Sequence, residues 1–221
     1  MTTRTIELSD ALLDYVAVHD SSRDALITEL IAETRAALPD EHDMQVSSEE
    51  AGLLAMLARI TGARDALEIG TFTGLSSLAV ARALPEGGRL ICCDVSEEWT
   101  AVARRYWARA GVADRVELRL GNAAETLAAM PAEPLFDLAF IDADKVSYPR
   151  YWAEVVPRMR AGGVIVVDNV LRAGRVLAPE DEPSRVVAAF NRQVLADPRV
   201  DSVMLPVADG ITVARVRTVG A

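Results

Sequence analysis

The spacing of apolar residues changes near residue 62 of the 221-residue sequence. Before that point apolar positions recur at helical intervals, and the pattern predicts three helices, over residues 9–20, 22–38 and 47–62. The third helix begins with Ser47 and Glu50, which have the spacing of a capping box. We therefore expect residues 1–62 to form an N-terminal helical cap.

Beyond residue 62, short apolar runs alternate with amphipathic stretches. The runs predict strands over 66–70, 89–94, 116–121, 135–142 and 162–169, and the stretches between them predict helices near 74–84, 97–110, 122–130 and 148–160. Strands and helices that alternate in this way form a parallel sheet with helices on both faces, a doubly wound α/β fold. No linker, repeat or low-complexity segment interrupts the chain, so we expect a single domain over residues 1–221.

The C-terminal part of the chain departs from this alternation. A helix is expected near 184–196, followed by two strands, 200–207 and 210–217, which the turn sequence Ala-Asp-Gly joins. Because so short a connection suits a hairpin, we expect the last pair of strands to be antiparallel.

Composition and charge exclude several classes of protein. The sequence is 51% hydrophobic, which supplies a sizeable core, but it contains no run of 18 apolar residues that would span a membrane. A net charge of −10 and a pI near 4.8 argue against a nucleic-acid partner. Cys92 and Cys93 are adjacent within an apolar run, and the N-terminus has no signal-peptide pattern, so we expect reduced thiols in a cytoplasmic protein.

Polar residues and glycines stand at the end of each predicted parallel strand. In open parallel sheets, ligands bind outside the carboxyl ends of the strands, so these positions predict a shared ligand site. The strand ends are Glu68 to Gly70, Asp94, Gly121 with Asn122, Asp142, and Asp168 with Asn169.

A glycine-containing loop, EIGTFTGLSS, follows the first of these strands. The pattern of Glu68, Gly70 and Gly74 is typical of S-adenosylmethionine (SAM) binding loops and does not match the dinucleotide fingerprint G-x-G-x-x-G. Asp94, at the end of the second strand, has the oxygens to accept hydrogen bonds from both hydroxyls of a ribose. The alternative interpretation is a tight turn followed by an acid that caps a helix.

Two later strands end in oxygen ligands and a single lysine. Asp142, Asp168 and Asn169 form a set that suits Mg²⁺ or Ca²⁺ rather than zinc, although these side chains could instead cap helices or bind a cofactor. Lys145 is the only lysine beside 22 arginines. A lysine can lose its proton near neutral pH when its surroundings lower its pKa, and arginine cannot, so Lys145 is a candidate general base as well as a candidate surface charge.

Five segments, from about residue 44 to the end, resemble the cation-dependent class I O-methyltransferases, the group of the caffeoyl-CoA and catechol O-methyltransferases. The segments are MQVSSEEA, LEIGTFTGLSSLAVARALPEGGRL, FDLAFIDADKVSYPRYW, GGVIVVDNVLRAGRVLAP and DPRVDSVMLPVADGITVARV. The resemblance implies a Rossmann-like, seven-stranded, mostly parallel sheet with an antiparallel last strand. It also implies SAM, a divalent cation (Mg²⁺ first, with Ca²⁺ or Mn²⁺ as substitutes) and a homodimer.

The resemblance further implies roles for individual residues. The metal ligands would be Asp142, Asp168 and Asn169, and Lys145 would be the general base that contacts the acceptor. Arg172 stands where relatives often have an aromatic residue against the acceptor ring; it could stack on a ring, pair with an acceptor carboxylate or point to solvent. SAM would be bound by Met44, Val46, Glu68, Gly70, Ser76, Asp94, Ala123, Asp142 and Asp144.

These features predict a metal- and SAM-dependent O-methyltransferase. Its acceptor would be a vicinal dihydroxy aromatic small molecule of the catechol, hydroxycinnamoyl, polyketide or flavonoid type. One alternative is a metal-independent small-molecule methyltransferase that acts on nitrogen or on a lone hydroxyl. A non-catalytic SAM-binding protein is the other, and it leaves the strand-end acids and Lys145 unexplained.

Overall fold

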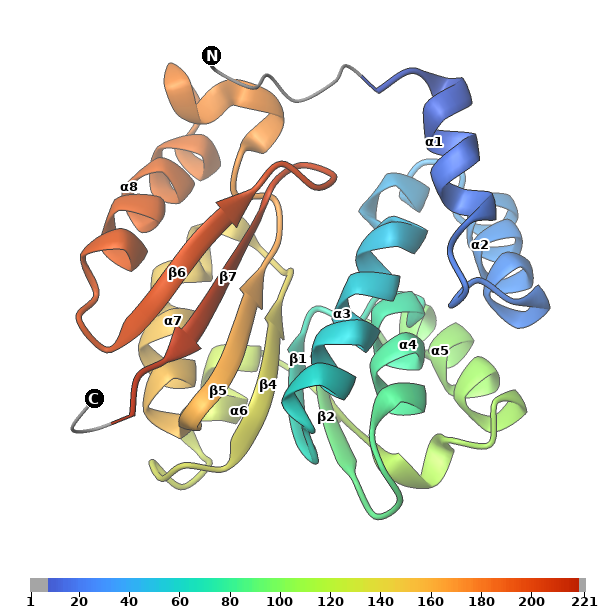
Figure 1. Cartoon of the computed structure of the whole chain (residues 1–221), viewed down its shortest axis with the longest axis horizontal. Coiled ribbons are helices and arrows are strands. Elements are labelled where there is room, and N and C mark those ends of the chain that lie inside the picture. The colour runs from blue at the N-terminus through green and yellow to red at the C-terminus, as the bar shows by residue number, and fades with distance from the viewer. Residues whose placement is uncertain (1–7, 219–221) are drawn as a thin grey trace.

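The computed structural model describes residues 8–218, which form a seven-stranded sheet with helices on both faces (Figure 1). The strand order is β3-β2-β1-β4-β5-β7-β6. The strands are β1 Asp65–Ile69, β2 Arg89–Asp94, β3 Val116–Leu120, β4 Phe136–Ile141, β5 Met159–Val167, β6 Val200–Leu205 and β7 Ile211–Val216. Strands β1 to β5 pair in parallel, whereas β7 is antiparallel to both β5 and β6. The doubly wound fold and its antiparallel last strand are thus confirmed.

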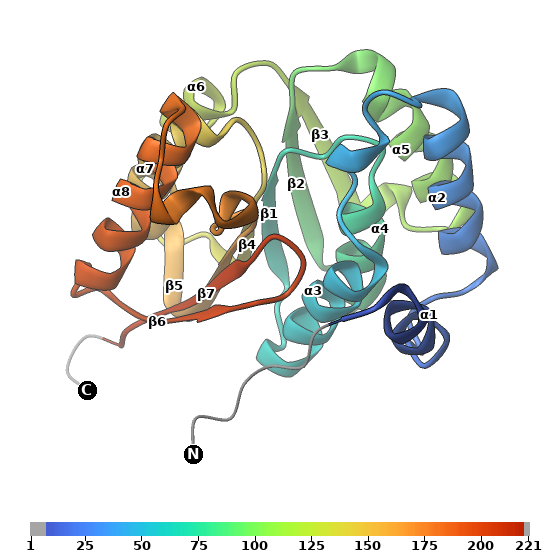
Figure 2. The same ribbon diagram turned by 90° about the horizontal axis from the view of Figure 1, so that it is seen from above.

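The helices divide between the two faces of the sheet, as the view from above shows (Figure 2). Helices α6, α7 and α8 cover one face, and α3, α4 and α5 cover the other, with α1 and α2 outside them. Their bounds are α1 Asp10–Val18, α2 Ala25–Ala37, α3 Ser48–Thr61, α4 Leu75–Ala83, α5 Glu97–Arg109, α6 Ala123–Ala128, α7 Tyr148–Val155 and α8 Glu182–Ala196. No helix of the described part is both long and apolar enough to cross a membrane.

One predicted helix is wrong at its C-terminal end. The apolar spacing predicts a helix over 148–160, but α7 ends at Val155 and β5 begins at Met159. Pro157 has no backbone N–H with which to continue the helical ladder. Arg160 then pairs with Asp137 at 2.8 Å and with Asp65 at 2.9 Å, which holds the start of β5 beside β4 and β1.

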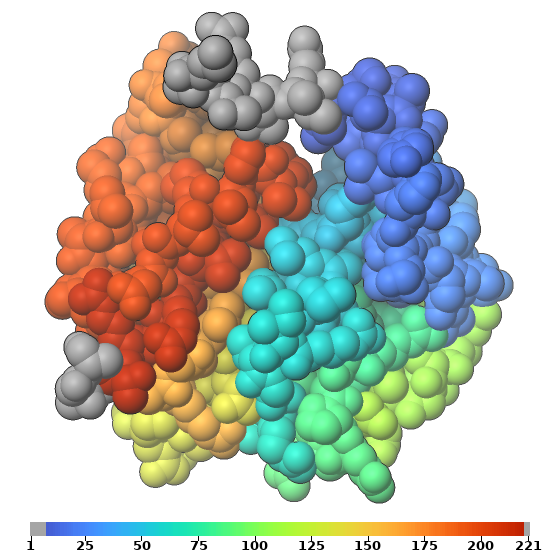
Figure 3. Space-filling model, viewed as in Figure 1, coloured from blue at the N-terminus to red at the C-terminus, as the bar shows by residue number. Residues whose placement is uncertain are grey.

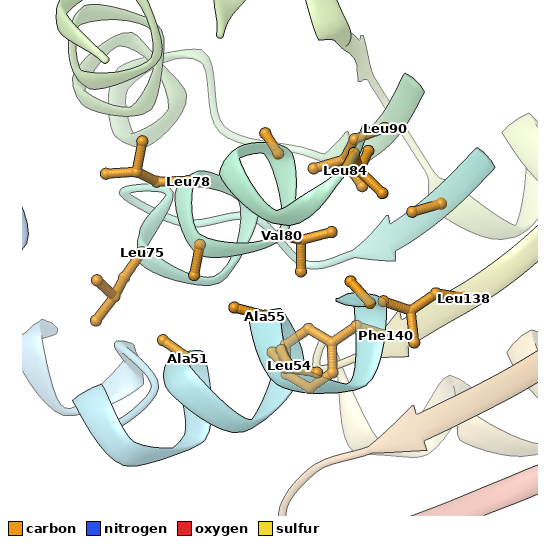
Figure 4. Packing of buried hydrophobic residues seen from close by; sticks show 14 of the residues in the cluster. Ala51, Leu54, Ala55, Leu75, Leu78, Val80, Leu84, Leu90, Leu138 and Phe140 are labelled. Carbon is orange, nitrogen blue, oxygen red and sulfur yellow. The ribbon is translucent and has the colours of Figure 1, made fainter. Parts of the chain in front are cut away.

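Helix α3 ties the N-terminal helices to the sheet. Helix α3 packs against α4, and its fully buried Leu54 and the neighbouring Ala55 belong to the same core cluster as Leu78 and Val80 of α4 (Figure 4). Burial of a leucine side chain stabilises the fold by roughly 2 kcal/mol, so this contact fixes the position of α3. Its N-terminal end then lies next to the carboxyl ends of the strands. That residues 1–62 form a cap on a single domain stays a prediction.

Candidate active site

A cavity of about 1020 Å³ opens at the carboxyl ends of the parallel strands. Gly70, Asp94, Asp142 and Asp168, which follow β1, β2, β4 and β5, line its floor. The segment 42–48 before α3 lines one wall, and Ala208 and Asp209 of the β6–β7 turn line another. Figure 3 shows a hollow between this turn and the N-terminal helices. The structure therefore brings the predicted strand-end residues into one space, with the exception of Glu68.

The loop after β1 is held by Asp94. One carboxylate oxygen of Asp94 accepts backbone N–H bonds from Thr71 and Phe72, each at 2.8 Å, and the other oxygen accepts one from Ser96 at 2.8 Å. Asp94 therefore organises the tight turn, but it is not a helix cap, because Ser96 caps α5. Asp94 also lines the cavity, where a ribose hydroxyl would share these engaged oxygens.

The two loop glycines are required by the protein itself. Gly70 has φ +90°, and a Cβ atom there would lie 1.8 Å from the backbone oxygen of Asp142. Gly74 also has φ +90°, and its Cβ would lie 2.5 Å from the Cβ of Ala103 in α5. Both glycines are thus needed for close contacts within the protein, with the residue after β4 and with α5.

Most of the residues predicted to bind SAM line the cavity, and Glu68 is the exception. Met44, Val46, Gly70, Ser76, Asp94, Ala123, Asp142 and Asp144 all line it. Glu68 lies beneath the loop, is 1% exposed and forms no part of the lining. Burial raises the pKa of Glu68 to about 8, while nearby Ser76 and Thr71 oppose the rise. Glu68 would therefore support the loop rather than contact a cofactor directly.

The three predicted metal ligands lie side by side because β4 and β5 are neighbours. Asp142 follows β4, and Asp168 and Asn169 follow β5, where the backbone N–H of Asp168 donates to Ile141 at 3.0 Å. Burial raises the pKa of the Asp168 carboxyl, and the charge of Asp142 raises it further. Two acids that repel each other in this way favour a cation between them.

Glu50 is a site residue that the sequence pattern did not identify. Ser47 caps α3 as predicted, accepting the backbone N–H of Glu50 at 3.2 Å. The reciprocal half of the capping box is wrong: the Glu50 carboxylate lines the cavity, and both of its oxygens are buried with no hydrogen-bond partner in residues 8–218. Burial and the charges of Asp168 and Asp142 raise the pKa of Glu50 well above its ordinary value.

Lys145 lies directly beside this acidic group. Its Nζ donates to Asp142 Oδ1 at 2.6 Å, and both side chains are largely buried. The same Nζ lies 5.3 Å from the centre of the Tyr148 ring. The hydroxyl of Tyr148 donates to the backbone oxygen of Asp168 at 3.0 Å, which links the start of α7 to the residue after β5. The surface-charge alternative for Lys145 does not agree with this burial.

The side chains near Asp142 offer oxygen donors that suit a divalent cation, although they do not include three acids arranged around one point. Across residues 8–218, no three side chains of His, Cys, Asp or Glu are arranged to hold a metal ion. The candidate site therefore consists of Asp142, Asp168 and the amide of Asn169. All are oxygen donors of the kind that Mg²⁺ prefers. The orphaned oxygens of Glu50 face the same acids and would gain a partner if a cation were bound.

Comparison with known proteins decides the family. A family model described as O-methyltransferase matches residues 18–217. The chain belongs to this O-methyltransferase family. It is 39% identical to tricin synthase 1 of Oryza sativa subsp. japonica over 97% of this chain and 91% of the relative. It is 38% identical to caffeoyl-CoA O-methyltransferase 1 of Arabidopsis thaliana over 78% and 71%.

Solved structures agree with this O-methyltransferase assignment. The enzyme superimposes on the O-methyltransferase TomG from Streptomyces achromogenes, solved in complex with SAM, with a TM-score of 0.81. The two share 34% identity over 92% of this chain and 96% of the other. The resemblance to the caffeoyl-CoA group is confirmed, and the protein is a SAM-dependent O-methyltransferase.

Proposed function

We propose that this enzyme transfers the methyl group of SAM to one hydroxyl of a vicinal dihydroxy aromatic molecule with the help of a divalent cation. The observation that carries the proposal is the pair of Lys145 and Asp142, set beside Asp168 in the cavity that also holds the SAM-type loop. The relatives named for caffeoyl-CoA and tricin support an aromatic acceptor.

The chemistry requires a phenol to become a nucleophile. A phenol hydroxyl has a pKa of about 10, so little of it is ionised at neutral pH. Asp142, Asp168 and Asn169 would hold the cation, which supplies a positive charge that acidifies and fixes two adjacent hydroxyls. Lys145 donates to Asp142 at 2.6 Å, which keeps its Nζ beside that site. A cation held by Asp142 would favour the neutral amine, and Nζ in that form would accept the phenol proton.

Other residues position the reactants. Tyr148 fixes the backbone of Asp168, and the hydroxyl of Tyr151 donates to Asp144, whose loop also carries Lys145. Met44 and Val46 stand over the cavity from the segment before α3, where they would exclude water from a positive sulfonium. Holding oxygen, methyl carbon and sulfur in line supplies much of the acceleration in such a transfer.

One observation favours a second candidate, metal-independent transfer to a lone hydroxyl. Asp142 is already paired with Lys145, and the described residues hold no three-acid metal cluster. In that case Lys145 alone would activate the acceptor.

The homodimer and the cytoplasmic location stay predictions.

An acceptor panel tests the proposal against this alternative. Enzyme, labelled SAM and Mg²⁺ are incubated with dihydroxybenzenes that differ only in the placement of their hydroxyls. Chelation by two adjacent oxygens predicts methylation of the 1,2-isomer and at least tenfold less of the 1,3- and 1,4-isomers. Equal rates on all three isomers would contradict chelation and support the metal-independent candidate.

A further inference from the structure

Arg172 is a half-buried cation in the candidate acceptor site, and it forms no ion pair with any residue of the described range 8–218. It follows Asn169 by three residues and lines the same cavity as Asp142 and Lys145. Its Nε is fully buried and has no hydrogen-bond partner in residues 8–218, and no acid in that range lies within ion-pair distance of it. Arg175, three residues later, is exposed and reaches Asp181 at 3.8 Å.

The backbone around Arg172 is held in an unfavourable conformation. Arg172 and Ala173 have φ values of 52° and 50°, in the left-handed region that is unfavourable for residues other than glycine. The β6–β7 turn maintains it: Asp209 accepts the backbone N–H of Leu171 at 3.0 Å, and its carboxylate accepts that of Ala173. Figures 1 and 2 show this loop and the turn side by side. The hydrogen bonds from this loop to the turn therefore fix the position of the backbone that carries the Arg172 side chain.

The loop of residues 171–173 and the β6–β7 turn are in such close contact that neither backbone has room to move. A Cβ atom on Gly210 would lie 2.3 Å from Cγ of Leu171. Asp209 lines the cavity beside Arg172, yet its carboxylate binds the backbone of Ala173 and not the guanidinium. The carboxylate of Asp209 therefore holds the loop, and the guanidinium of Arg172 stays available to bind a ligand in the cavity.

Arg172 also lies in the same cavity as the proposed reacting groups, because it lines the cavity together with Asp142, Lys145 and Asp168. A buried donor without an acceptor is costly, and a carboxylate satisfies an arginine fork with two charge-assisted hydrogen bonds.

We propose that Arg172 binds a carboxylate carried by the aromatic acceptor, so that the enzyme selects anionic catechols. The inference rests on the proposed function, whose acceptor class it narrows. A neutral acceptor would leave the guanidinium of Arg172 without an anionic partner, whereas a carboxylate on the ring or side chain would bind the guanidinium while the hydroxyls face Asp142 and Lys145. Ring stacking by Arg172 is the competing role, and it would not distinguish an acid from its amide.

The test compares 3,4-dihydroxycinnamate with its primary amide, which has the same ring and no charge. Wild-type enzyme, Arg172→Gln and the matched control Arg175→Gln are assayed with Mg²⁺ and SAM. A charge-assisted pair corresponds to about 10- to 100-fold in kcat/KM, so the wild type and Arg175→Gln should prefer the acid by at least about tenfold. Arg172→Gln should lose that factor on the acid and stay within about threefold of wild type on the amide. Equal losses on both acceptors would overturn the inference.

Binding to enzyme loaded with S-adenosylhomocysteine, measured by calorimetry, separates the two proposals. Charge-selective binding that depends on Arg172, without methyl transfer, would overturn the function and keep the inference. Methyl transfer with no preference for the acid would overturn the inference alone. Should Arg172→Gln not fold, Arg172→Lys serves instead; it keeps the charge, loses the fork and should retain part of the preference for the acid.

Discussion

Lys145 and Asp142 form a partly buried ion pair, with Nζ 2.6 Å from Oδ1, at the point where β4 meets the cavity. The pair joins two roles that the sequence separates by three residues: an acid that can hold a cation and an amine that can accept a proton. Arginine at 145 would keep the ion pair but could not become neutral. The proposed mechanism therefore depends on the identity of this residue as well as on its charge.

Replacement of Lys145 separates a base from a simple positive charge. We expect Lys145→Ala to lower kcat by about 10²- to 10⁴-fold, because general-base catalysis contributes on that scale, with SAM affinity changed little. Lys145→Arg should not restore the rate. Steady-state kinetics and calorimetric SAM binding measure both effects, and the exposed Arg150→Ala is the control from the same segment. Full activity in Lys145→Arg would show that only the charge matters.

Glu50 should release a proton when Mg²⁺ binds. Burial, Asp168 and Asp142 raise the pKa of Glu50, so its carboxyl holds a proton at neutral pH, and an approaching dication favours the ionised form. Calorimetric titration with Mg²⁺ in two buffers of different ionisation enthalpy counts the released protons at pH 7. Glu50→Gln should release fewer than the wild type, and Glu49→Gln, one residue away and outside the cavity, should match the wild type. An unchanged count in Glu50→Gln would place Glu50 outside the cation site.

Glu68 should make stability fall as pH rises. Its pKa is about 8 in the folded protein and 4.5 without burial, so between these values the folded chain holds a proton that the unfolded chain has lost. The contribution of Glu68 to the free energy of unfolding is fully present below pH 4.5. It declines as the pH rises to about 8, by up to about 1.4 kcal/mol per pH unit.

Urea unfolding of the wild type and Glu68→Gln between pH 5 and pH 8 measures this effect as a difference. The variant should gain stability relative to the wild type as pH rises, while Glu125→Gln, at an exposed position, should follow the wild type. Parallel curves for wild type and Glu68→Gln would show that Glu68 ionises freely in the folded state.

The gathering of Asp142, Asp168 and Asn169 could be predicted, since neighbouring parallel strands end at one edge of a sheet. Glu50 could not, because its spacing from Ser47 explains it equally well as a local capping residue. Its actual direction depends on the packing of α3 against α4, which is a tertiary contact. In the same way, the early start of β5 depends on ion pairs from Arg160 to residues far away in the sequence.

The most direct test of the account is the dependence of methyl transfer on a divalent cation. Enzyme treated with EDTA and then dialysed is assayed with SAM and a catechol acceptor while Mg²⁺ is titrated back, beside Asp168→Asn and the exposed control Asp201→Asn. The account predicts no measurable transfer without the cation, saturable recovery in the wild type and Asp201→Asn, and recovery in Asp168→Asn only at a much higher Mg²⁺ concentration. Full transfer in EDTA would contradict it.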